Sequence, residues 1–96
     1  MMELGGNIFL DGFSELNGGE MLIIKKLVGN YVKEVSEKKD NFEKLNLNLN
    51  KSVLGEKNVF HITAELRAGE KYNAEVRDGN IFFAMNKVFT EINNNL

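Results

Sequence analysis

The chain contains no cysteine and no proline, and it has a single histidine among its 96 residues. Without cysteine the protein has no disulfide framework, no thiolate metal site and no cysteine nucleophile. A single histidine excludes a histidine-rich metal site, and we expect no metal and no other cofactor. Because no proline marks a linker and 96 residues suit one core, we predict a single domain over residues 1–96.

Long apolar runs are also absent, since no stretch approaches 18 consecutive apolar residues, and we expect no contact with a membrane. Residues 1–6 lack a basic region followed by an apolar run, so we expect no signal peptide and a cytoplasmic protein. Twelve basic and fourteen acidic residues give a net charge of −2. A general nucleic-acid-binding protein usually has a basic excess, so a nucleic-acid contact would need a local basic patch.

The most informative feature present is the alternation of apolar and polar residues over 43–51, 59–67 and 71–77. A period of two places successive side chains on opposite faces of a strand. Three consecutive strands with one apolar face are typical of an antiparallel sheet that is buried on one side. The turn at Gly69 must hold an odd number of residues, because only then do Leu66 and Tyr72 share a face. The predicted apolar face consists of Leu45, Leu47, Leu49, Phe60, Ile62, Ala64, Leu66, Tyr72, Ala74 and Val76.

Two amphipathic helices flank these strands. Asn17, followed three residues later by Glu20, predicts the start of a helix that runs to about Lys38. Asp78 is the predicted cap of a last helix over about 79–93. The buried stripes are predicted from 3-and-4 spacing: Ile24, Leu27, Val28, Tyr31 and Val35 in the first helix, and Ile81, Met85, Val88 and Ile92 in the second.

These elements give an α+β fold. We predict a short first strand over residues 7–11, a loose tail over residues 1–6 and a frayed end over residues 93–96. The order is then β-α-β-β-β-α, and a helical crossover makes the first two strands parallel. We therefore predict a two-layer α/β sandwich with a four-stranded mixed sheet and both helices on one face.

A small basic patch lies on the predicted outer face of the first helix. It consists of Lys25, Lys26 and Lys33, with Gly29 between them. A small residue there would let a phosphate backbone or another helix approach closely. These three lysines are the predicted RNA-binding residues, although phosphate binding usually needs more than three cations and an ordinary solvated helix face is the alternative.

Two large apolar residues, Leu22 and Phe83, also fall on predicted outer faces of the helices, and Phe83 shares its face with Lys87. Single exposed apolar residues are common. If the helices lie side by side, however, Leu22, Phe83 and Lys87 would form one surface for a partner protein or a second copy of the chain.

His61 is the only classical general base, and it lies on the predicted polar face of the sheet with Arg77 opposite and Glu75 diagonal to it. No nucleophile motif accompanies it, and an open sheet face is a poor place to exclude water. We therefore predict no catalytic residue and no enzymatic activity.

The element order and the segment 79–92 resemble the ribosome-associated hibernation factors, the protein Y family. Phe82, Ala84, Met85 and Ile92 match apolar positions in that family's last helix. The resemblance implies a β-α-β-β-β-α domain whose helices present basic residues to ribosomal RNA. Here Lys87 is the only basic residue of the last helix, so Lys25, Lys26 and Lys33 carry what remains of that surface.

The leading functional hypothesis is a small, non-enzymatic binding module whose target is the ribosome or structured RNA. The main alternative is a protein-interaction or homodimerisation domain that uses its helical layer. An enzyme built on His61 is a distant third. Salt-dependent RNA retention would separate the first two, because phosphate contacts weaken steeply as salt is added.

Overall fold

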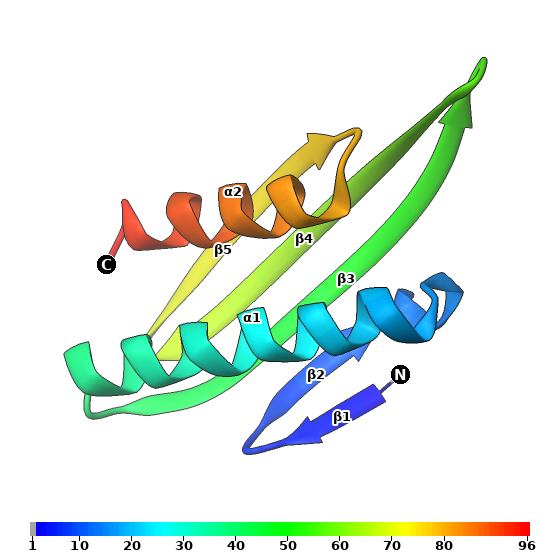
Figure 1. The fold of residues 1–96 in the computed structure, drawn as a ribbon. Helices are drawn as coiled ribbons and strands as arrows, with labels where there is room; N and C mark the ends of the chain where they lie inside the picture. The colour runs from blue at the N-terminus through cyan, green and yellow to red at the C-terminus, as the bar shows by residue number, and fades with distance from the viewer. Residues whose placement is uncertain (1) are drawn as a thin grey trace.

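The computed structural model describes residues 2–96, which form a five-stranded sheet covered on one face by two α-helices (Figure 1). The elements in chain order are β1 Met2–Gly5, β2 Ile8–Asp11, the 3₁₀ turn η1 Phe13–Glu15, α1 Gly18–Lys38, β3 Phe42–Leu54, β4 Lys57–Ala68, β5 Glu70–Asp78 and α2 Ile81–Asn93.

The sheet has the order β1-β2-β3-β4-β5, in which β2 and β3 are parallel and the other neighbours are antiparallel. The mixed sheet and the single helical face confirm the predicted α+β architecture. The predicted number of four strands was wrong, because residues 2–5 form β1 instead of a loose tail. A tight turn at Gly6–Asn7, with φ of 60° and 65°, folds β1 back onto β2.

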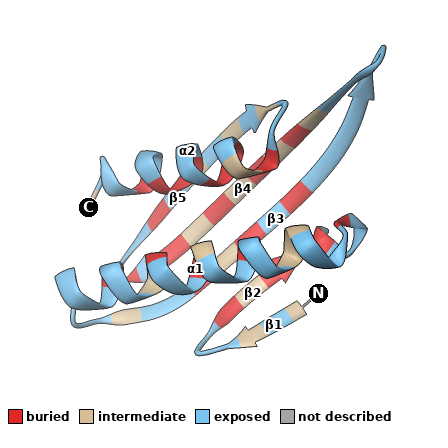
Figure 2. Cartoon of the chain, viewed as in Figure 1, coloured by how far each residue is buried: buried red, intermediate tan, exposed pale blue. Residues whose placement is uncertain are grey.

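The register of the three-strand meander matches the alternation in the sequence. Leu47 lies opposite Ala64, which in turn lies opposite Ala74, and Leu66 lies opposite Tyr72. Gly69 alone separates the paired residues Ala68 and Glu70, so the turn holds an odd number of residues as predicted. The alternate residues of β3 and β4 that face the helices are buried, and they form one core with the inner sides of α1 and α2 (Figure 2).

Helix α1 begins with the predicted capping box. The Asn17 side chain accepts from the Glu20 backbone N–H at 2.8 Å, and the Glu20 carboxylate accepts from the Asn17 N–H at 3.0 Å. For α2 the predicted cap was wrong. Asp78 still belongs to β5, where it pairs with Phe60, and the cap is Asn80, whose Oδ1 accepts from Phe82 and Phe83.

Strands β3 and β4 form a long hairpin that extends beyond the rest of the fold. Strands β3 and β4 continue beyond their neighbours to a two-residue turn at Gly55–Glu56, where Gly55 has a φ of 65°. Glycine at the first turn position with positive φ is typical of the type II′ hairpin turn. The hairpin therefore projects past both helices, and its surface is exposed (Figures 1 and 2).

Candidate nucleic-acid interface

The buried stripe of α1 determines where its lysines lie. Ile24, Val28, Tyr31 and Val35 are buried against the sheet. At about 100° per residue, Lys26 and Lys33 lie on the opposite side of the helix, two turns apart and nearly in line. Lys25 lies a quarter turn round the helix, on the side that faces β1. The predicted basic patch is therefore solvent-facing.

All three lysines are exposed, and none forms an ion pair with another residue of 2–96. A methyl group placed on Gly29 would meet nothing within 4 Å. The surface between Lys25 and Lys33 is thus open, and nothing within the described chain competes for the ammonium groups. We name Lys25, Lys26, Lys33 and Gly29 the α1 stripe.

A shallow hollow of about 390 Å³ lies beside the α1 stripe, between α1 and the first hairpin. Its lining includes Lys25 and Gly29 from the helix and Glu3, Leu4 and Ile8 from the strands. Glu3 adds a negative charge at the edge of the patch. Sequence reasoning missed this neighbour because it treated residues 1–6 as a tail, so it did not place β1 in the sheet.

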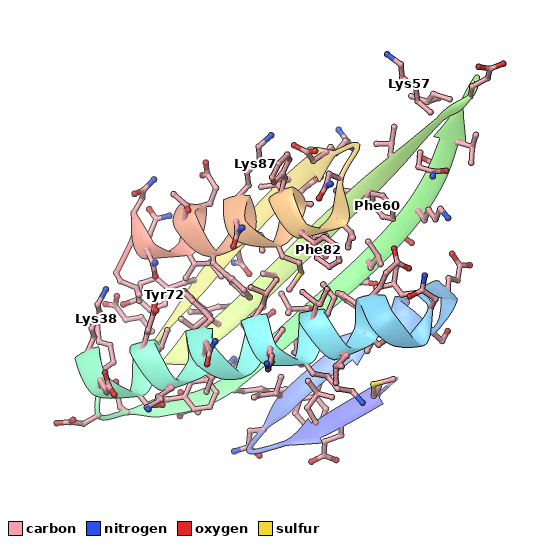
Figure 3. The ribbon with its side chains drawn as sticks, in the orientation of Figure 1. Lys38, Lys57, Phe60, Tyr72, Phe82 and Lys87 are labelled. Carbon is pink, nitrogen blue, oxygen red and sulfur yellow. The ribbon has the colours of Figure 1, made fainter. Side chains whose placement is uncertain are left out.

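Helix α2 contributes little positive charge. The Lys87 Nζ lies 2.5 Å from the Asp78 Oδ2, so its charge is already partnered. This hydrogen bond, reinforced by the Asn80 backbone N–H, lowers the pKa of the Asp78 carboxyl below its usual range. In Figure 3 the Lys87 side chain points away from α1, so it does not extend the α1 stripe.

The predicted partner surface does contain exposed apolar side chains. Leu22 is 66% exposed and Phe83 is 62% exposed. The side of α1 that faces α2 carries Leu27, which lines a hollow of about 410 Å³ between the helices. Leu22 lies about 140° round the helix from Leu27, so it points away from that hollow. Ile23 lies nearer to that side and is 46% exposed.

Two contacts between α1 and α2 hold the side chains at the base of the hollow between the helices. The Tyr31 and Phe89 rings stack with their centroids 4.0 Å apart and 8° between planes. The Tyr31 hydroxyl donates to the Asn93 Oδ1 at 3.0 Å, and burial raises the Tyr31 pKa to about 12. These contacts join the C-terminal halves of the two helices into one layer.

His61 occupies the position predicted for it on the uncovered sheet face. It lies opposite Arg77, and its Nε2 is 2.5 Å from the Glu75 Oε1. The Arg77 guanidinium is 3.8 Å from the same carboxylate oxygen. The neighbouring hollow of about 290 Å³ on this face is lined by Phe9, Asp11, Asn46, Leu47, Asn48, Thr63, Ala64, Glu65 and Asn73, and His61 is not among them. The geometry is that of a surface hydrogen bond between His61 and Glu75, and within residues 2–96 it brings no nucleophile to the histidine.

A comparison with known structures identifies a protein with a similar fold. The structure is similar to the crystal structure of the Thermus thermophilus Protein Y N-terminal domain, with a TM-score of 0.55. The match covers 92% of this chain and 90% of that chain, at 17% sequence identity. The fold is that of the Protein Y N-terminal domain.

No family model matches the chain, and no curated protein matches its sequence. The similarity in structure confirms, for the fold alone, the resemblance to Protein Y that the sequence predicted. Within residues 2–96 no helix is long and apolar enough to cross a membrane.

Proposed function

We propose that this protein is a non-enzymatic binding module that contacts structured RNA of the ribosome through the α1 stripe. The observation that carries the proposal is a set of three exposed, unpartnered lysines around an open glycine on the helical layer of a Protein Y-like fold. Lysine ammonium groups gain affinity for phosphates by releasing condensed counterions, and the lysines of the α1 stripe are unpaired within the described chain.

The size of the patch limits the affinity. Three phosphate contacts give a slope of about −2 to −3 in a plot of log K against log salt. Binding should therefore be weak, and it should be lost near physiological salt unless contacts from other molecules assist. Glu3, at the edge of the patch, lowers the local positive potential further.

The test is retention on purified small-subunit particles at low salt. Replacement of Lys25, Lys26 and Lys33 by Glu should abolish retention. The matched control replaces Lys44, Lys57 and Lys71 by Glu, which changes the net charge equally on β3, β4 and β5, outside the α1 stripe. Equal retention of the two triple variants would exclude the α1 stripe as the binding surface.

A second candidate is docking of a partner protein on the helical layer, favoured by the exposed side chains of Leu22, Ile23 and Phe83. Burial of apolar surface depends little on ionic strength, whereas phosphate contacts depend on it strongly. Retention that resists salt and is lost in Phe83→Glu would favour this candidate over RNA binding. Phe83 is exposed, so this substitution should leave the fold intact.

A further inference from the structure

The outer part of the long hairpin is a two-stranded ribbon without support. Strand β2 pairs with β3 only as far as Asn48, and β5 pairs with β4 only as far as Phe60. From Asn50 to Val59 the described chain therefore supplies no third strand. No helix covers either face of this segment (Figure 1). We name residues 50–59 the arm.

The arm carries exposed apolar side chains at its tip. Val53 is 61% exposed and Leu54 is 69% exposed, and all residues from 50 to 58 are exposed. An isolated two-stranded hairpin is at best marginally stable in water, and a third strand with an apolar face is normally needed. The arm therefore combines exposed apolar side chains with unpaired strand edges. Both features favour the addition of another strand.

The free edge of β3 lacks the usual protection against pairing. Natural proteins protect edge strands with proline, with bulges or with charged side chains, lysine above all. The register of β3 with β4 runs without a shift from Lys44 to Leu54, and the chain has no proline. Lys51 is the only charged residue in 50–54, and its ammonium group lies over the Phe60 ring of its own chain, 5.8 Å from the centroid.

We propose that a second copy of this chain is the partner of the arm, and that the β3 edges of the two copies pair antiparallel through residues 50–54. The two ribbons then form a four-stranded sheet of order β4-β3-β3-β4, which meets the strand number that an independent sheet needs. The interface is self-complementary and closes as a two-fold dimer, because each copy contributes the same edge.

The structure also selects a register. Gly12 packs against the backbone carbonyl of Leu49, so pairing can begin only at Asn50. A two-fold axis at Lys51 would place the two Lys51 side chains opposite each other, which is unfavourable. An axis at Val53 pairs only residues 52–54 before the turn. An axis at Ser52 pairs all five residues and sets Lys51 opposite Val53 of the second copy.

Engineered cysteines test this register, because the natural chain has none. At the two-fold axis the Ser52 side chains lie directly opposite each other, with Cβ atoms about 4.5–5.5 Å apart. Ser52→Cys should form a disulfide-linked dimer under mild oxidation. Asn50→Cys is the matched control. It is exposed on the same face, but the two Asn50 residues lie about 13 Å apart along the strands, so this variant should form no disulfide-linked dimer. A dimer linked through Cys at position 51 or 53, and not at 52, would overturn the register.

Sedimentation tests the dimer without a cross-link. The wild-type protein should show a monomer–dimer equilibrium that depends on concentration. Ser52→Lys should remain monomeric with an unchanged unfolding midpoint, because Ser52 is exposed in the monomer and like charges would oppose each other only in the dimer. A wild type that is monomeric at its highest soluble concentration would overturn the proposal, and so would a dimer that survives Ser52→Lys. A dimer that Phe83→Glu dissociates would assign the interface to the helical layer instead.

Discussion

Substitution of Gly12 by Ala should destabilise the protein strongly. Gly12 has a φ of 81°, which costs an L-residue with a side chain roughly 1–2 kcal/mol. A Cβ at this position would also lie 2.1 Å from the Leu49 carbonyl oxygen. Leu49 is buried in the core, so its backbone cannot retreat without disturbing packing, which typically costs about 1–3 kcal/mol. We expect a total loss of about 2–5 kcal/mol.

Gly29→Ala is the matched control, because it makes the same chemical change at an open position. Gly29 lies inside α1, and an added methyl group meets nothing within 4 Å. Glycine in a helix interior is less stable than alanine by roughly 0.5–1 kcal/mol. This variant should therefore be more stable than the wild type by that amount.

Urea unfolding followed by circular dichroism measures both variants. The unfolding midpoint should move to lower urea for Gly12→Ala and to higher urea for Gly29→Ala, with little change of slope. A Gly12→Ala variant within about 0.5 kcal/mol of the wild type would behave as a surface change. Such a result would refute the close approach of Gly12 to β3. That approach fixes the position of the segment between β2 and α1, and therefore the position of the α1 stripe.

Two further predictions concern the core and the helical layer. Ile62→Ala should cost roughly 2–5 kcal/mol in the same assay, because Ile62 is fully buried. His61→Ala on the uncovered face should stay within about 0.5 kcal/mol, and equal losses would mean that the strand register is wrong. The Tyr31 pKa of about 12, against 10.0 as its ordinary value, predicts that stability falls between pH 10 and 12. In that range the unfolded state has lost a phenolic proton that the folded state keeps. A thermal-unfolding profile over this range should be flatter for Tyr31→Phe, and an unchanged profile would argue against the buried phenol.

The meander could be predicted from sequence because one of its faces is buried. The alternation around Leu47, Ile62 and Ala74 reports directly which side chains meet the helices. The same reasoning underestimated the hairpin. Beyond Asn50 both faces are exposed, so no alternation marks the arm, and residues 52–58 were not assigned to strands.

Two errors arose where a local signal was present but was given too little weight. Gly6 and Asn7 both adopt positive φ, and such a pair between short apolar segments is a hairpin signal. It would have identified β1 and the acidic neighbour Glu3. The position of the α2 cap was wrong because Asp78 and Asn80 are both good caps. Only the pairing of Asp78 with Phe60 shows that the strand continues through it.

The lysine positions of the candidate site were accessible from helical periodicity, since the stripe of Ile24, Val28 and Tyr31 faces the sheet. The relation between Leu22 and Phe83 was not, because it depends on how two helices lie side by side. That arrangement is determined by contacts such as the Tyr31–Phe89 stack.

The salt dependence of binding to a labelled small-subunit rRNA fragment tests the central claim most directly. The wild type should give a log–log slope of about −2 to −3, and each replacement of Lys25, Lys26 or Lys33 by Gln should reduce its magnitude by about 0.7–0.9. Lys44→Gln, on the opposite face, should leave the slope unchanged. A wild-type slope near zero, or a slope that none of the three α1 replacements alters, would contradict RNA binding through the α1 stripe.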